Sequence, residues 1–266
     1  SQASQAARMI TSWAQPSTKV QLSISCEFLR KLESGYAPNS FVVVGMRNSK
    51  EEDWLEIGRT EVISHDVNPH WVKLITISYF FEIEQYLKFE VFNSNNSNTS
   101  NDATNISLNK QIMIGRSECA LAVVVGNRGS TWKSKLSQAA PAEGSQIRKP
   151  GCITVRAEEV SDHNAVVTLA LSAKGLKPAC KKYFAVSTAN PYLRICRISE
   201  DGTPVPCYRT EVVMNTLSPV WVPISAPLSV LSAGEMRRPL LLEVWCWRKS
   251  GKHIRMGHAK ASVSDL

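Results

Sequence analysis

The sequence predicts an all-β protein made of two tandem antiparallel β-sandwiches, with about eight strands in each. Three observations support this prediction. Short runs alternate apolar with polar residues, no stretch is typical of a helix longer than about three turns, and the order of motifs occurs twice. A sheet that no helix covers buries its apolar face against a second sheet. The 266 residues are enough for two such domains.

The predicted strands occur in the same order in both halves of the chain. Residues 18–25 (TKVQLSIS) alternate apolar and polar side chains, and residues 165–172 (AVVTLALS) repeat that alternation. The other predicted strands are rich in β-branched and aromatic residues, and clusters of Gly, Pro, Asn and Ser separate them. These strands are expected at residues 40–46, 73–81, 86–92, 191–198 and 239–247.

One motif makes the duplication explicit. RTEVISHDVNPHWV at residues 59–72 matches RTEVVMNTLSPVWV at residues 209–222, with Arg-Thr-Glu-Val, the Pro and the Trp in register. Four further segments recur in the same order at an offset of about 150 residues, which indicates a duplicated domain. We expect Trp71 and Trp221 to pack in the two cores.

The expected boundaries follow from this duplication. They are an N-terminal tail at 1–17, a first domain at 18–140, a linker at 141–151 and a second domain at 152–266. The tail lacks the long apolar core of a secretory signal, so a short amphipathic helix or a loose tail is expected. Between Gly126 and Gly151 the chain is small and polar, and part of this segment is alternatively a last hairpin of the first copy.

The composition favours an anionic partner. The formal net charge of +8 and the pI of about 9.2 suit a phospholipid surface, nucleic acid or an acidic protein. The seven cysteines are scattered without C-x-x-C spacing, so free thiols in a reducing compartment are expected. No apolar run reaches the roughly 18 residues needed to cross a bilayer. We therefore expect a cytoplasmic protein that is peripheral on membranes.

The sequence contains no motif of a common enzyme class. The nucleophile elbow G-x-S-x-G, the P-loop and the zinc motif H-E-x-x-H are all absent, so no catalysis is predicted. Cys246, His253 and His258 lack the fourth ligand and the close pairing of a zinc site, so no metal site is predicted. Nucleic acid is not an expected partner, because no helix-turn-helix or RNA-recognition motif accompanies the basic residues.

The repeated motifs resemble those of the two C2 domains of copines. The R-T-E-V…N-P-x-W element of the first copy carries the resemblance, together with E-V-V-M-N-x-L-S-P-x-W and the later V-W-x-W…G-K-H of the second copy. The resemblance covers residues 19–266. It implies β-sandwiches of the C2 type that dock on phospholipid through calcium ions held by acidic loops. Copines continue into a von Willebrand factor A-type domain, which is absent from this chain.

The positions at which the resemblance implies acidic calcium ligands are not acidic in this chain. Asn keeps an oxygen but lacks the charge on which calcium affinity depends, and Arg repels the ion. Calcium is therefore expected to be lost, and no other cofactor is expected. The Asn-rich segment 93–109 has the composition of a disordered surface excursion, and we assign it no chemistry. The altered calcium positions are Asn39, Asn93, Asn95, Asn190, Cys246, Arg248 and Ile254.

The loop VWCWRKSGKHIRMG at residues 244–257 has four formal cations and no carboxylate. We predict that it joins other basic loop residues in a calcium-independent attraction to anionic phospholipid, at about 1 kcal/mol per cation. Two alternatives stay open, namely a solvated loop tip and a protein-interaction scaffold that binds no lipid directly. The predicted lipid-binding residues are Arg248, Lys249, Lys252, Arg255, Lys177, Lys181, Lys182, Arg30 and Lys31.

Overall fold

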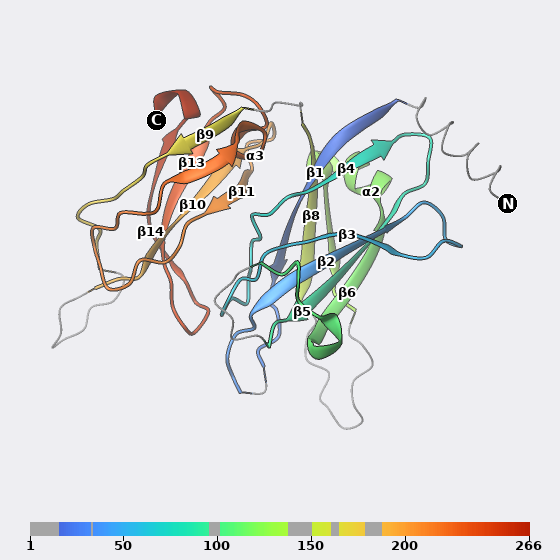
Figure 1. Ribbon diagram of the computed structural model, residues 1–266, viewed down its shortest axis with the longest axis horizontal. Coiled ribbons are helices and arrows are strands. Elements are labelled where there is room, and N and C mark those ends of the chain that lie inside the picture. The colour runs from blue at the N-terminus through green and yellow to red at the C-terminus, as the bar shows by residue number, and fades with distance from the viewer. Residues whose placement is uncertain (1–15, 33, 96–101, 138–150, 161–164, 179–187) are drawn as a thin grey trace.

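The structure is a computed structural model that describes residues 16–32, 34–95, 102–137, 151–160, 165–178 and 188–266. Its described residues form two β-sandwiches that lie side by side (Figure 1). This arrangement confirms the predicted all-β class. Within the described part of the chain, no helix is long and apolar enough to cross a bilayer. The predicted N-terminal tail lies almost entirely outside the described residues.

The first sandwich has eight strands in two four-stranded antiparallel sheets. The strands are β1 (Ser17–Glu27), β2 (Ser40–Arg47), β3 (Leu55–Arg59), β4 (Ile75–Phe80), β5 (Tyr86–Asn93), β6 (Ile112–Ala120), β7 (Thr131–Lys135) and β8 (Cys152–Glu159). The order is β4-β1-β8-β7 in one sheet and β3-β2-β5-β6 in the other. Alternate side chains such as Leu22, Phe89 and Ile153 are fully buried between the sheets, as a half-buried strand requires.

The second sandwich repeats the frame with six described strands. They are β9 (Val166–Leu169), β10 (Pro191–Ile198), β11 (Pro204–Arg209), β12 (Ile224–Pro227), β13 (Leu240–Cys246) and β14 (Ile254–Ala261). The sheet β11-β10-β13-β14 packs on the pair β12-β9. About eight strands were expected in each copy, whereas the described residues of the second copy contain no counterparts of β7 and β8.

The helices in the described part of the chain are short. Their bounds are η1 (Leu108–Lys110), α2 (Leu121–Gly126), η2 (Arg128–Ser130), α3 (Leu228–Ser232) and η3 (Val263–Asp265). None of them is long enough to cover a sheet, so the two cores are closed by sheet-on-sheet packing.

Strand β8 moves the expected boundary between the domains. Its residues were expected to open the second domain, but β8 pairs with β1 on one side and β7 on the other. Ile153 and Val155 are fully buried in the first core. The local sequence does not say which sheet this segment joins, because pairing depends on distant residues. The hairpin left open as an alternative was placed within residues 126–151. Strand β7 lies in that segment, but its hairpin partner β8 lies beyond it.

The duplicated motif builds the same hydrogen bonds in both sandwiches. The Thr60 hydroxyl accepts from the Val42 amide at 2.9 Å, and the Thr210 hydroxyl accepts from the Leu193 amide at 2.9 Å. The Glu that follows each Thr accepts from a backbone amide just beyond the Trp, at 2.8 Å in both copies. These polar side chains satisfy backbone groups that would otherwise be left without partners.

The two tryptophans are core residues, as expected. Trp71 is 1% exposed and Trp221 is 3% exposed. Each donates its backbone N–H to a carbonyl oxygen of the segment beside it, at 3.2 Å to Ile24 and to Leu171. The R-T-E-V…P-x-W motif is therefore structural, and it fixes the loops at one end of each sandwich.

The Asn-rich segment of the first copy departs from its expectation. Of this segment, residues 93–109, the structure describes 93–95 and 102–109. Ala103 and Ile106 fold back over β2 and β5 and are buried there with Phe41 and Phe92. The composition of the segment predicted disorder because its few apolar residues are widely spaced, yet these two pack against the sheet.

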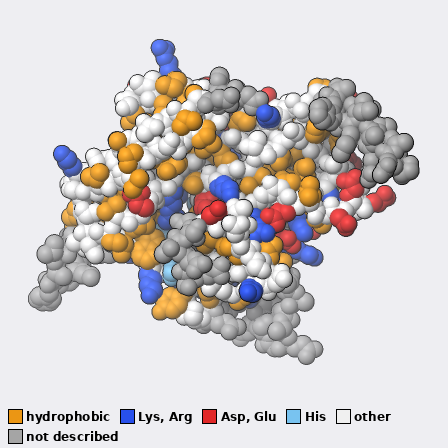
Figure 2. All heavy atoms as spheres, viewed as in Figure 1, with side chains coloured by type: hydrophobic (Ala, Val, Ile, Leu, Met, Phe, Trp, Pro, Cys, Tyr) orange, Lys and Arg blue, Asp and Glu red, His pale blue; other side chains and the backbone are white. Residues whose placement is uncertain are grey.

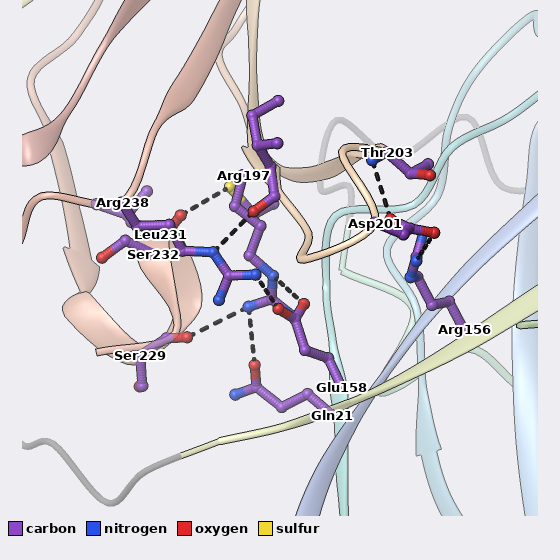
Figure 3. Close-up of polar contacts among 12 residues, drawn as sticks. Gln21, Arg156, Glu158, Arg197, Asp201, Thr203, Ser229, Leu231, Ser232 and Arg238 are labelled. Carbon is purple, nitrogen blue, oxygen red and sulfur yellow. Dashed lines mark hydrogen bonds and ion pairs between the residues drawn. The ribbon is translucent and has the colours of Figure 1, made fainter. Parts of the chain in front are cut away.

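A buried cluster of charges connects the two sandwiches (Figure 3). Arg197 on β10 is fully buried and lies 2.7 Å from Glu158 on β8. Its Nη1 also donates to Gln21 on β1 at 3.2 Å, and Arg238 forms a second ion pair with Glu158. A second pair joins Arg156 to Asp201 nearby. On the side of the first sandwich, strands β1 and β8 therefore make the contact, and it places the two sandwiches in a defined relation.

Candidate functional site

The loop end of the first sandwich carries a network of amide side chains where acidic calcium ligands were expected. Oδ1 of Asn93 accepts from the Asn39 backbone amide at 3.0 Å, and its Nδ2 donates to Oδ1 of the Asn95 side chain at 2.9 Å. Asn39 in turn accepts from the His65 amide at 3.0 Å. The side-chain oxygens that would have faced an ion are thus occupied by N–H groups. They hold the loops together, and they are not arranged as an oxygen cage.

The second sandwich repeats the last of these contacts. Asn190 accepts from the Asn215 amide at 2.9 Å, and its backbone oxygen accepts from Trp247 at 2.8 Å. Asn215 and His65 both adopt positive φ, 56° and 55°, so the two copies share this turn. Cys246 is buried and pairs in register with Ile254, which begins β14. Neither supplies an oxygen ligand from its side chain.

No candidate metal centre is found among the described residues. They contain no group of three or more His, Cys, Asp or Glu side chains placed to hold an ion. The residues at the expected calcium positions do not fit the ion, because they offer neutral amides, a thiol, an alkyl group and a guanidinium in place of carboxylates.

Three of the described cysteine thiols are unsuited to nucleophilic chemistry because burial raises their pKa. Six cysteines are unpaired in the described part of the chain, in agreement with the expected free thiols. Burial raises the pKa of Cys119 and of Cys196 to about 12, and it raises the pKa of Cys207 to about 11. A thiol that stays protonated is a poor nucleophile.

Four predicted cations are exposed at the loop end. Arg30 and Lys31 lie in the β1–β2 loop, and Lys249 and Lys252 lie in the β13–β14 loop. The Lys249 ammonium lies 5.6 Å from the ring centroid of Tyr36, which is also in the β1–β2 loop. This contact places the loop of Lys249 and Lys252 beside the loop of Arg30 and Lys31, which belongs to the other sandwich. On the face seen in Figure 2, basic and hydrophobic side chains occur together at this end.

The remaining cations of the 244–257 loop have different surroundings. Arg255 lies 3.1 Å from Glu243, and Glu243 also pairs with Arg194 at 2.6 Å. Burial tends to raise the pKa of Glu243, but its hydrogen bonds from Arg194 and Arg255 hold it below the ordinary value. Arg255 therefore has a counter-charge on the neighbouring strand, which a count of loop residues missed.

Arg248 is half-buried and does not lie at the exposed tip. Its backbone N–H donates to Nδ1 of His253 at 3.0 Å, so the loop closes on itself. Lys177 is exposed at the start of the β9–β10 loop. Lys181 and Lys182 lie outside the described residues. Lys249 and Lys252 thus lie on the loop that contacts the loop of Arg30 and Lys31, whereas Arg255 is paired with Glu243.

Two exposed aromatic residues accompany the cations, and the sequence prediction did not include them. Phe28 is 71% exposed and Tyr36 is 51% exposed, both in the β1–β2 loop. Phe28 has a φ of 59°, which directs the chain sharply at the end of β1. Their position in the same loop as Arg30 and Lys31 could have suggested that they belong to the predicted lipid-binding group. They were not included because a single aromatic residue in a loop is more often packed than exposed.

Comparison with known proteins identifies the architecture. A family model described as C2 domain matches residues 20–134 and 165–266. The chain belongs to the C2 domain family. The two matched segments correspond to the two sandwiches, which confirms the C2 type that the resemblance implied.

One similar relative is Protein BONZAI 2 of Arabidopsis thaliana. It is 32% identical over 252 residues, which make up 94% of this chain and 42% of the relative. The chain therefore spans less than half of the length of this relative.

Solved structures of C2 proteins are also similar. The structure named BON1-C2B has 29% sequence identity and a TM-score of 0.33, over 38% of this chain and 65% of that chain. The paired C2 domains of Extended-Synaptotagmin 2 have 15% identity and a TM-score of 0.37, over 94% of this chain and 80% of that chain. The family assignment rests on the sequence matches.

Proposed function

We propose that this tandem C2 chain is a non-enzymatic module of copine type that attaches to anionic phospholipid without calcium. The observation that carries the proposal is the exposed group of Arg30, Lys31, Lys249 and Lys252 at the loop end. A calcium-dependent loop needs the ion to reverse its negative charge before it meets an anionic surface. This loop end is positive without an ion.

The amide networks support independence from calcium. Asn39, Asn93 and Asn95 hydrogen-bond to one another and to backbone groups, so the loops are ordered without an ion. The exposed rings of Phe28 and Tyr36 suit the headgroup region, where an aromatic ring finds both apolar and polar surroundings.

Co-sedimentation with phosphatidylserine vesicles, in calcium and in chelator, tests this function. We expect equal binding in both conditions and weaker binding at high salt. Reversing the four cations (R30E/K31E/K249E/K252E) should lower the partition coefficient at least ~100-fold, since each cation near the surface contributes about 1 kcal/mol. Vesicles without anionic lipid should bind neither protein.

A matched control reverses four exposed cations at the opposite end of the sandwiches. The variant K50E/R128E/R237E/K260E changes the net charge equally, but its residues are far from the loop end, where strands β5 and β13 finish. It should retain most of the binding. If both variants lose binding equally, net charge alone explains the effect and the loop end has no special role. Binding only in calcium would contradict the proposal.

A protein-interaction scaffold is the second candidate function. Met214, Val220 and Val222 are more than half exposed in the β11–β12 loop of the second sandwich. Exposed apolar residues in one loop favour contact with another protein. Absence of vesicle binding in both calcium and chelator would favour this candidate, and binding to a protein partner would then depend little on salt.

A further inference from the structure

The β13–β14 loop of the second sandwich packs against two loops of the first. Gly251 is buried at the tip of this loop, with a φ of 74°. A Cβ atom at this position would lie 2.7 Å from the Cβ of Ala37 and 2.7 Å from the backbone oxygen of His65. Only a glycine fits such a close approach, so the loop of one sandwich is seated on the β1–β2 and β3–β4 loops of the other.

A continuous row of rings runs through this contact. His65 of the first sandwich lies between Tyr36 and Trp247, with centroid distances of 6.5 Å and 6.0 Å. Trp247 stacks on His253 at 6.4 Å, and His253 meets Tyr192 edge-on at 6.0 Å. Ring pairs at these distances attract each other beyond the area that they bury. The row therefore joins residues of both sandwiches.

A buried polar pair fixes the orientation of His253. Its Nδ1 accepts from the Arg248 amide at 3.0 Å, so the proton of the neutral ring is on Nε2. That nitrogen faces the carboxylate of Asp66 at 3.5 Å, across the boundary between the sandwiches. Asp66 is 8% exposed and therefore unavailable to repel an anionic surface from outside.

The exposed rim of the contact is basic and aromatic. It carries Arg30, Lys31, Lys249 and Lys252, together with the rings of Phe28 and Tyr36. Among the described residues of the contacting loops, 28–32, 34–39, 63–68 and 247–253, Asp66 is the one carboxylate. The rim is complementary in charge to an anionic bilayer, and Tyr36 is contacted by Lys249 from the other sandwich.

We propose that the β1–β2 loop of the first sandwich and the β13–β14 loop of the second form one continuous surface for an anionic bilayer. The surface binds as a unit because the β13–β14 loop, with two of the exposed cations, is seated against the β1–β2 loop, which carries the other two. The Arg197–Glu158–Arg238 cluster holds the sandwiches together (Figure 3). This inference rests on the proposed function and adds that the lipid contact spans the boundary between the two C2 domains.

The variant Gly251→Ala tests the inference without changing any charge. The added Cβ collides with Ala37 and His65, so the loop should leave its seat and take Lys249 and Lys252 with it. We expect faster hydrogen exchange in residues 34–39 and 247–253. We also expect a partition onto phosphatidylserine vesicles that is lower by roughly tenfold or more, because two of the four cations leave the common surface.

The matched control is Gly202→Ala. Gly202 has a φ of 81°, so alanine there has a similar backbone strain, but nothing lies within 4 Å of the added Cβ. Both the exchange at the loops and the vesicle binding should stay as in the unaltered chain. If Gly251→Ala prevents folding, Ala37→Val makes the same intrusion from the opposite loop, since Ala37 is 2% exposed.

The outcomes separate the two proposals. If Gly251→Ala releases the loop but binds vesicles as strongly as the unaltered chain, the two loops act independently and the inference is overturned. If the four-cation variant also binds as strongly as the unaltered chain, the proposed function itself fails. Loss of binding in both of these variants, with Gly202→Ala unchanged, supports one surface across both domains.

Discussion

Two histidine side chains at the boundary between the sandwiches are kept neutral by their surroundings. Burial and the nearby guanidinium groups of Arg209 and Arg194 lower the pKa of His253 to about 4. Burial and Arg194 do the same for His70, whose pKa is also about 4. Both rings would have to become charged in a place where water is scarce and other cations are close.

The free energy of unfolding should therefore fall as the pH drops from 6.5 towards 4. In this window the unfolded chain binds protons at His70 and His253, with an ordinary pKa of 6.5, while the folded chain does not. Burial raises the pKa of Asp66, which opposes the trend because its folded form binds a proton more readily. Urea unfolding at pH 7 and pH 5 measures the difference.

Replacing the two histidines identifies the source of this dependence. His70→Gln and His253→Gln should each reduce the change in unfolding free energy between pH 7 and pH 5, whatever their effect at pH 7. His258 is exposed on β14, and His258→Gln provides the matched control. A pH dependence that persists undiminished in both buried-site variants would assign it to other groups.

At the scale of single residues, the sequence predicted which chemical groups occupy the loop positions better than it predicted which residues those groups contact. The missing acids were visible because Asn39, Asn93 and Asn190 stand in a recognisable motif. The pairing of Arg255 with Glu243 was not visible, because the two residues are 12 positions apart and meet only across paired strands. The contact between Gly251 and Ala37 could not be predicted from the sequence either, because the two residues belong to different domains.

At the scale of elements, the returning part of the β5–β6 segment depends on one guanidinium. Arg59 donates from Nη1 to the backbone oxygens of Ile106 at 2.6 Å and Ala103 at 3.3 Å, while its other nitrogens pair with Glu56. Ile106 and Ala103 are then held over Phe41. The segment therefore owes its order to a side chain on β3.

Arg59→Gln should loosen this segment and leave the sandwich intact. Loss of charge-assisted hydrogen bonds worth about 2 kcal/mol should speed hydrogen exchange at residues 102–110 tenfold or more. The duplicated position gives the control, because Arg209 lies over the Tyr192 ring at 4.0 Å and does not hold a returning segment. Arg209→Gln should leave residues 102–110 protected, and equal exchange in both variants would contradict the assigned role.

The positions of most strands were predictable from the sequence, whereas the neighbours with which they pair in a sheet were not. Alternation in residues 18–25 and the β-branched and aromatic run at residues 86–92 predicted strands that the structure confirms. Cys152–Glu159 was not among the predicted strands, and the expected boundary assigned it to the second domain. In the structure it pairs with β1 and β7, because a local residue pattern says nothing about the distant strand that receives the hydrogen bonds.

At the scale of the whole molecule, a buried charge cluster links the two sandwiches. Glu158 is flanked by Arg197 and Arg238, and Arg197 is fully buried. Removing one partner of a buried pair leaves a charge without compensation, at a cost of about 3–5 kcal/mol. Glu158→Gln should therefore destabilise the tandem by about that amount in urea unfolding.

An ion pair with both partners exposed is the matched control. Lys133 and Glu27 are 53% and 41% exposed, so Glu27→Gln should cost no more than about 1 kcal/mol. We also expect Glu158→Gln to separate one cooperative transition into two, as the sandwiches begin to unfold independently. Equal and small effects of the two changes would mean that the cluster does not couple the domains.

The duplication itself was predictable from its repeated motif, but the contact between the copies was not. Glu158 and Arg197 read as ordinary surface charges in single strands, and only the folded arrangement removes both from water. Composition likewise gave the net charge of +8 without saying that Lys249 meets Tyr36 of the other domain.

The position of β8 gives the short connection 160–165 a role of its own. This segment leaves the strand that carries Glu158 and enters β9, so the two faces of the contact are tethered next to each other. A short tether gives an effective concentration in the millimolar range. Faces that would separate as free domains can then stay together. Cleavage within 160–165 would turn the arrangement of the two sandwiches into a bimolecular association that dilution reverses.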